Sequence, residues 1–299
     1  MADSTAWDRF VASLERGVTS REDLESLDLA ALRQLNDIER ERARQLLVAK
    51  LDDGDPRIID ALVELDTPKA WADVEKAFTS SWGSAQIHAA MWLWMRKKDP
   101  RVVPQLKSLA LGNPKAPSFV SEIVLALERI ETNEADDAMV DILAATHDSG
   151  VTSATTDRIF VRHHWDQWEN PGAPIFTLRC GLTSVFPTVR QRAIDELRAL
   201  IAEQRAGKSD AQLGLDGQGV QQKSPALQQV FALALDPNAT VPDNQTLDQL
   251  RGGERDWGID MLLGRLEQGD TRVVQGLQHL GGDRVQLALD DHQAGRRIS

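Results

Sequence analysis

The sequence is short of the residues on which several classes of protein depend. It contains one cysteine, Cys180, so it can form neither an intramolecular disulfide nor a cysteine-based zinc site. Tyrosine is absent and aromatic residues make up 5% of the chain, although eight of them are tryptophan. Residues that favour strands are not clustered, and no run alternates between apolar and polar residues as a half-buried strand does. These absences predict an all-α protein.

Basic residues are scarce relative to acidic ones. The 299 residues contain 34 Lys and Arg against 46 Asp and Glu, which gives a formal net charge of −12 and a pI near 5.0. A protein that binds nucleic acid usually carries a basic patch, so this balance argues against DNA or RNA as a partner. An acidic surface favours solubility and attracts basic partners instead.

An export signal and long apolar runs are also missing. The first 20 residues lack a basic segment followed by an apolar one, and no apolar run approaches the ~18–20 residues that cross a bilayer. We therefore expect a cytoplasmic protein that does not enter a membrane. The sequence also has no phosphate-binding loop or nucleophile elbow, and Cys180 lies in an apolar segment that predicts a buried, inert thiol. Accordingly, we expect no enzymatic activity, no cofactor and no metal site.

The sequence does contain an internal repeat. Each copy has Asp, then Pro or Thr, then Arg and two β-branched residues, with a Leu three residues further on, and the copies begin at Asp55, Asp99 and Asp270. The first two are about 44 residues apart, within the period of about 40–47 residues that HEAT and armadillo arrays show. Asp is a preferred helix N-cap and Pro a preferred first helical residue, so Asp55 and Asp99 predict helix starts with Pro56 and Pro100 at the first position.

These openings, together with the segment 189–197 (Val-Arg-Gln-Arg-Ala-Ile-Asp-Glu-Leu), resemble degenerate HEAT-like repeats. The resemblance implies an all-α, HEAT-like α-solenoid of antiparallel helix pairs in two layers. We expect the array over residues 1–203 and its C-terminal repeats, continuing or capping it, over 225–299. Residues 204–224, rich in Gly, Gln and Ser, are expected to be a mobile, protease-sensitive loop.

Apolar residues recur at helical spacing along most of the chain, which predicts consecutive helices. The expected helices cover about 4–16, 20–35, 37–52, 55–65, 68–79, 84–98, 99–111, 118–131, 134–146, 174–185, 187–203, 225–235, 244–251, 256–266 and 270–280, followed by a final short one. Residues 148–157, which are rich in Ser and Thr, are expected to form a loop.

The predicted helix over 84–98 is apolar on two faces. One stripe contains Ile87, Ala90, Met91, Trp94 and Met95, and a second, rotated away from it, contains His88, Trp92 and Met95. A helix of this kind is either packed on both sides or lines an exposed groove, and the inner helices of a solenoid form its concave binding surface. Burial of both Trp92 and Trp94 in the core is the alternative.

A second aromatic stretch extends from Arg162 to Gly172. Its His and Asp residues lack the paired i,i+4 spacing of a helical metal site, whereas Trp is enriched at interface hot spots. We expect this stretch to join the Trp92 face in one protein-binding groove, with ordinary packing of its Trp residues as the alternative. The predicted binding residues are His88, Trp92, Met95, His163, His164, Trp165 and Trp168.

HEAT-like arrays serve as scaffolds, inhibitors, adaptors and a few enzymes. The size, acidity and missing catalytic motifs favour a protein that binds another protein. It would act either as an inhibitor, such as a toxin-immunity protein, or as a scaffold or adaptor. The negative net charge favours a basic partner. The alternative is a HEAT-like DNA glycosylase that acts on alkylated bases, which the Trp residues suggest. The acid excess opposes it, because phosphate contacts need clustered Lys and Arg and the one dense basic run is 96–101.

Overall fold

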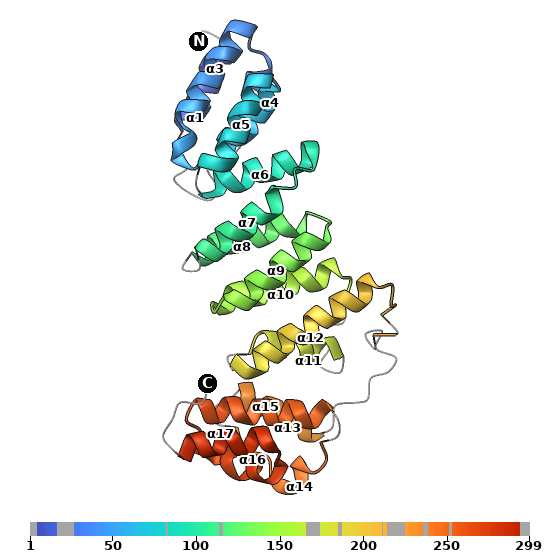
Figure 1. Cartoon of the computed structure of the whole chain (residues 1–299). Coiled ribbons are helices and arrows are strands. Elements are labelled where there is room, and N and C mark those ends of the chain that lie inside the picture. The colour runs from blue at the N-terminus through green and yellow to red at the C-terminus, as the bar shows by residue number, and fades with distance from the viewer. Residues whose placement is uncertain are drawn as a thin grey trace. The chain divides into compact units, whose positions relative to one another are not determined.

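The computed structural model describes residues 5–16, 27–81, 83–113, 116–165, 174–184, 187–210, 212–213, 225–235, 239–250 and 253–293. Within these residues the chain forms 17 α-helices and two short 3-10 turns, with no β-strand (Figure 1). The all-α prediction is therefore confirmed. Across the same residues, no helix is both long enough and apolar enough to cross a membrane. The chain divides into two compact units, Met1–Ala145 and Thr146–Ser299.

Helices in the first unit pack mainly on helices that are near in sequence. They are α1 (Ala6–Glu15), α2 (Leu29–Arg33), α3 (Asp37–Ala49), α4 (Pro56–Leu65), α5 (Pro68–Ser80), α6 (Gly83–Lys97), α7 (Val102–Gly112), α8 (Pro117–Glu128) and α9 (Asn133–Ala145), with a 3-10 turn at Leu51–Asp53. Helix α6 contacts α4, α5, α7 and α8, and α9 packs on α7 and α8. This packing places α6 at the centre of the unit, between α4 and α8.

The second unit is built in the same way. Its elements are α10 (Ser149–Arg162), α11 (Pro174–Leu182), α12 (Pro187–Arg205), α13 (Pro225–Leu235), α14 (Asn244–Leu247), α15 (Gly253–Glu267), a 3-10 turn at Thr271–Val273, α16 (Val274–Leu280) and α17 (Asp283–Gln293). Helix α15 contacts α12, α13 and α16, and α11 packs along α12. The core of this unit therefore gathers around α15.

The three repeat copies form the same local structure. In each, the Asp carboxylate accepts a hydrogen bond from the backbone amide of the Arg two residues later and also pairs with that guanidinium. The Arg Nη2 to Asp Oδ2 distances are 2.7 Å for Arg57–Asp55, 2.6 Å for Arg101–Asp99 and 2.7 Å for Arg272–Asp270. One side chain thus caps a backbone turn and neutralises an arginine; we call this arrangement the Asp-x-Arg clasp.

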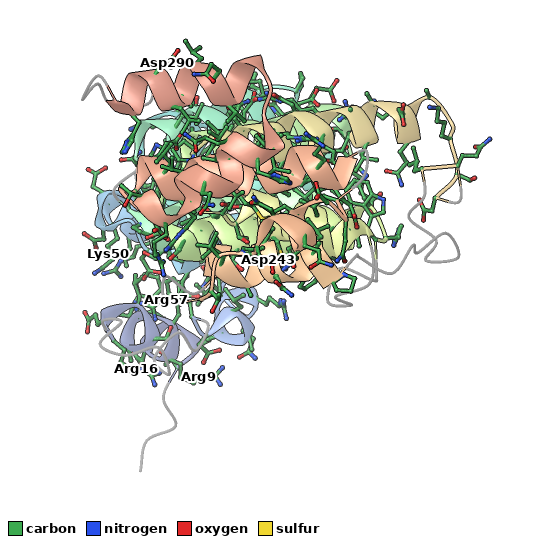
Figure 2. The ribbon with its side chains drawn as sticks, turned by 90° about the horizontal axis from the view of Figure 1, so that it is seen from below. Arg9, Arg16, Lys50, Arg57, Asp243 and Asp290 are labelled. Carbon is green, nitrogen blue, oxygen red and sulfur yellow. The ribbon has the colours of Figure 1, made fainter. Side chains whose placement is uncertain are left out.

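The first clasp also links two helices. Arg57 Nη2 donates to the carbonyl oxygen of Arg16 at 3.3 Å, which ties the start of α4 to the end of α1 (Figure 2). As predicted, Asp55 is the N-cap of α4 and Pro56 is its first residue. The prediction for Pro100 is wrong, because Pro100 and Arg101 form a turn and α7 begins at Val102.

Residues 148–157 form a helix rather than the predicted loop. Asp148 caps α10 by accepting a hydrogen bond from the Val151 amide at 2.9 Å. The helix buries Val151, Thr152, Thr155, Thr156, Ile159 and Phe160. Threonine lowers helix propensity by only a few tenths of a kcal/mol, so burial of Val151, Ile159 and Phe160 outweighs the local preference.

The two compact units divide between Ala145 and Thr146. The expected organisation, with an array over 1–203, a loop over 204–224 and C-terminal repeats over 225–299, stays a prediction. Helix α12 continues to Arg205, and of residues 204–224 the structure describes 204–210 and 212–213. The mobility of that segment lies largely outside the described residues and stays a prediction. The helix expected from Ser20 is described only over α2, which Asp28 caps.

Candidate functional site

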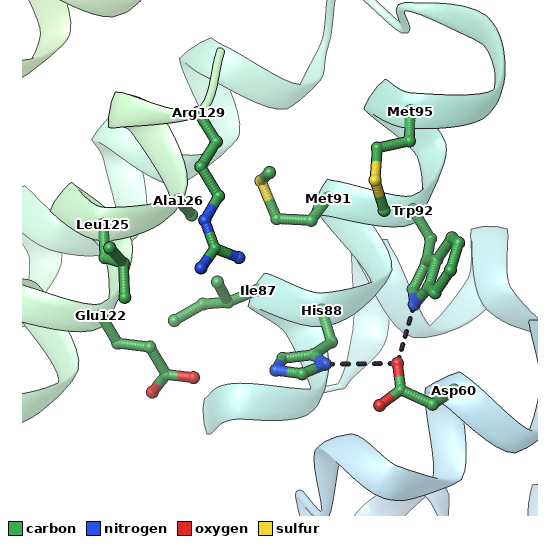
Figure 3. Close-up of a pocket in the computed structure, with 10 residues that line it drawn as sticks. All are labelled: Asp60, Ile87, His88, Met91, Trp92, Met95, Glu122, Leu125, Ala126 and Arg129. Carbon is green, nitrogen blue, oxygen red and sulfur yellow. Dashed lines mark hydrogen bonds and ion pairs between the residues drawn. The ribbon is translucent and has the colours of Figure 1, made fainter. Parts of the chain in front are cut away.

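A pocket of about 350 Å³ lies among three helices of the first unit (Figure 3). Helix α4 contributes one lining residue, α6 five and α8 three, and the tenth, Arg129, directly follows α8. They are Asp60, Ile87, His88, Met91, Trp92, Met95, Glu122, Leu125, Ala126 and Arg129. The pocket opens to solvent at Met95, which is 52% exposed. Its walls are helices rather than loops, so the lining side chains are held by regular backbone.

Helix α6 buries its alanines together with Ile87 and Leu93, and its large residues Met91, Trp92 and Met95 line the pocket. Ala85, Ala89, Ala90 and Leu93 are all buried, whereas Met91 and Trp92 are half-buried. The core stripe predicted from the sequence is therefore only partly right. Trp94, which was also placed on it, is half-buried with Lys98 Nζ 5.1 Å from its ring centroid. Small residues let neighbouring helices approach closely, and the bulky side chains are left on the outward face.

Asp60 fixes the orientation of Trp92. Trp92 Nε1 donates to Asp60 Oδ1 at 2.7 Å, and His88 Nδ1 lies 3.4 Å from the same oxygen (Figure 3). His88 and Trp92 are four residues apart, which places both on one face of the helix. Burial alone would raise the pKa of Asp60, but the hydrogen bonds from His88 and Trp92 outweigh it and lower the pKa below its ordinary value. Asp60 is therefore a carboxylate at neutral pH.

Helix α8 supplies the other two charged groups of the pocket. Glu122 Oε2 accepts a hydrogen bond from Ser84 Oγ at 2.7 Å, which holds it against the start of α6. Arg129 follows the last turn of α8, where a cation interacts favourably with the helix dipole. Its guanidinium extends into the pocket (Figure 3). The pocket thus has an apolar floor with both signs of charge at its edges.

The structure brings together three of the seven predicted binding residues. His88, Trp92 and Met95 all line the pocket. His163, His164 and Trp165 belong to the second unit, at the end of α10, and Trp168 lies outside the described residues. The single groove expected to join both stretches stays a prediction.

Trp165 is a core residue, as the alternative of ordinary packing predicted. It is 3% exposed, and its ring meets Phe160 edge-on at 5.6 Å and stacks on His163 at 4.9 Å. The cause is the left-handed conformation of His164, whose φ is 58°. It reverses the chain so that the Trp165 amide donates to the Phe160 carbonyl oxygen at 3.0 Å and the indole folds back on that ring. His163 Nδ1 lies 2.5 Å from Gln204 Oε1, so this ring too makes an internal contact.

The polar half of the pocket was missed in the sequence. Asp60, Glu122 and Arg129 come from helices other than the one whose two apolar faces drew attention. A signal was present, because in the expected two-layer array of helix pairs alternate helices lie in the same layer. Polar residues on the helix two before and the helix two after the one that carries Trp92 were therefore candidates to face it.

Comparison of the chain with protein-family models, curated proteins and solved structures found no match. The resemblance to HEAT-like repeats therefore rests on the sequence alone and stays a prediction.

Proposed function

We propose that this chain is a HEAT-like α-solenoid, with antiparallel helix pairs in two layers, that acts in the cytoplasm by binding another protein. In this proposal α4, α6 and α8 belong to the inner layer, and the pocket among them receives a segment of the partner. The protein then acts as an inhibitor of the immunity type or as a scaffold. The observation that carries the proposal is the pocket formed by Trp92, Met91 and Met95 on rigid helices.

The chemistry of the lining suits a protein ligand. Methionine side chains are flexible and polarisable, so Met91 and Met95 can adapt to an apolar side chain of a partner. Trp92 presents a large ring whose N–H is already satisfied by Asp60, so covering the ring leaves no donor unpaired. A pocket of about 350 Å³ lies at the small end of the range for ligand sites, a size that suits one or two side chains.

The DNA glycosylase alternative gains no support from the arrangement of the cations. Arg96 stacks on Trp71 at 3.8 Å, and Arg101 is held by Asp99 in the second clasp. Lys97 also pairs with Asp99, at 3.5 Å. The dense basic run is thus engaged within the first unit, and the pocket itself holds two carboxylates that would repel phosphates. We therefore do not propose this activity.

Peptide selection on the full chain tests the proposal. Random peptides of about 12 residues, displayed on phage, are selected on the wild-type protein, and the enriched sequences are synthesised. Trp92→Ala should weaken their binding by ~2 kcal/mol or more, roughly 30-fold, because a central aromatic anchor is lost. Trp71→Ala is the matched control, since it removes a half-buried Trp from α5 outside the pocket and should leave the affinity unchanged.

Methionine-methyl NMR locates the bound peptide independently. Of the five methionines, Met91 and Met95 line the pocket, while Met139 and Met261 are buried elsewhere at 0% and 3% exposure. Titration should shift the Met91 and Met95 signals and leave the other two in place. Equal affinity for the wild type and Trp92→Ala, or shifts confined to Met139 and Met261, would contradict the proposal.

A further inference from the structure

Arg129 stands apart from the other described arginines of the first unit. Nine other arginines described there each have a guanidinium that makes a hydrogen bond, an ion pair or a ring contact. They are Arg9, Arg16, Arg33, Arg40, Arg42, Arg44, Arg57, Arg96 and Arg101. The Arg129 guanidinium has no such partner in the described part of the chain, although the protein carries an excess of acids.

The other charged groups of the pocket already have partners. Asp60 accepts from Trp92 and lies beside His88, and Glu122 accepts from Ser84. The guanidinium of Arg129 therefore provides the pocket's unpaired cationic donors, and they point into it (Figure 3). Met91 and Leu125 lie beside them as apolar surface.

A guanidinium presents paired donors that match the two oxygens of a carboxylate. A polyanion such as a nucleic acid fits less well, because its further charges would approach Asp60 and Glu122. A cationic side chain would be repelled by Arg129 itself. The lining therefore favours one isolated carboxylate next to an apolar group.

Building on the proposed function, we infer that the pocket recognises an acidic side chain of the partner protein together with an apolar neighbour. The Asp or Glu carboxylate pairs with Arg129, and the neighbouring apolar side chain lies on Met91, Met95 and the Trp92 ring. A partner that is basic overall, as the net charge of −12 favours, can still supply this single carboxylate.

The test repeats the peptide selection on four full-length proteins. These are the wild type, Arg129→Gln, Arg129→Glu and the control Lys76→Gln, which makes the same charge change as Arg129→Gln at an exposed site on α5 outside the pocket. The wild type and Lys76→Gln should enrich Asp or Glu beside Leu, Ile, Met or Phe. Arg129→Glu should instead enrich Lys or Arg at the same position, because the charge in the pocket is reversed.

Synthetic peptides then measure the pairing directly. Exchanging the selected Glu for Gln should weaken binding to the wild type about tenfold or more, yet change binding to Arg129→Gln by less than about twofold. Unchanged Met139 methyl signals and melting temperatures in the unliganded variants establish that the first unit is still folded.

Two results would overturn the inference, and they are distinguishable. If wild-type peptides carry Lys or Arg, or tolerate the exchange of Glu for Gln, while Trp92→Ala still weakens them, the acidic preference is wrong and protein binding stands. If no selected peptide depends on Trp92, the proposed function fails, and the role of Arg129 fails with it.

Discussion

At the residue scale, the Asp-x-Arg clasp occurs three times in the part of the chain that the structure describes. In the second copy Asp99 is buried, and its hydrogen bond from Arg101 holds its pKa below the ordinary value of 3.8. A carboxyl whose folded pKa is depressed stabilises the fold above its unfolded pKa, and this contribution is lost as the pH falls through the folded pKa. The clasp should therefore matter at neutral pH and weaken in acid.

Asp99→Asn tests this, because it replaces one carboxylate oxygen by an amide nitrogen and leaves the shape of the side chain almost unchanged. At pH 7 the variant should lose about 1 kcal/mol of unfolding free energy, a modest figure because Arg101 is 58% exposed and water screens the pair. Urea denaturation should show that the difference in unfolding free energy between the variant and the wild type becomes smaller as the pH falls below about 4. The exposed Asp53 provides the control substitution Asp53→Asn. If this difference in unfolding free energy stays constant with pH, the charge of Asp99 is not what stabilises the turn.

Trp92→Phe separates the ring of the pocket from its hydrogen bond. The variant keeps an aromatic anchor but removes the donor to Asp60, so we expect about 1 kcal/mol less stability and a nearly unchanged affinity for selected peptides. Loss of a hydrogen bond to the carboxylate should also raise the pKa of Asp60, which carboxyl-carbon NMR can follow. A large loss of peptide affinity, with an unshifted Asp60 pKa, would contradict this division of roles.

At the element scale, the contact of α11 with α12 and α15 depends on a glycine. A Cβ at Gly181 would lie 2.5 Å from Trp257 Cη2 and 2.8 Å from Ala193 Cβ. Gly181→Ala should therefore cost about 1–3 kcal/mol, as overpacked cores do. Gly112→Ala, near the end of α7 with open space at its Cβ, should be neutral or slightly stabilising. Thermal melts decide, and equal melting temperatures for the two variants would show that α11 can shift without cost.

Most helices could be predicted from sequence because their signals are local. Asp55 and Pro56 cap and open α4 by chemistry that needs no tertiary contact. Helix α10 could not be predicted in this way, because its Ser and Thr residues favour a loop locally and the helix is stabilised by tertiary burial of Val151, Ile159 and Phe160. The same holds for the site. The amphipathic pattern of α6 identified Trp92 as a candidate site residue. Arg129 comes close to Trp92 only because α8 packs on α6, which no local pattern indicates.

At the scale of the whole molecule, the chain separates into two units at a point that has no sequence signature. Residues 145–148, Ala-Thr-His-Asp, contain neither Gly nor Pro, and helices continue on both sides. The Gly-rich segment 204–224 was the expected boundary because composition was the available signal. Amino-acid composition cannot predict a boundary that depends on which helices pack together.

This division predicts where binding resides. All residues that line the pocket lie between Asp60 and Arg129, inside the first unit. A fragment of residues 1–145 should therefore be helical, unfold cooperatively and bind the selected peptides within about twofold of the full chain, while 146–299 should not bind them. Its Met91 and Met95 methyl signals should coincide with those of the full chain, with Met139 as internal reference. A helical 1–145 fragment with displaced Met91 and Met95 signals and no binding would mean that the pocket is shaped by the second unit.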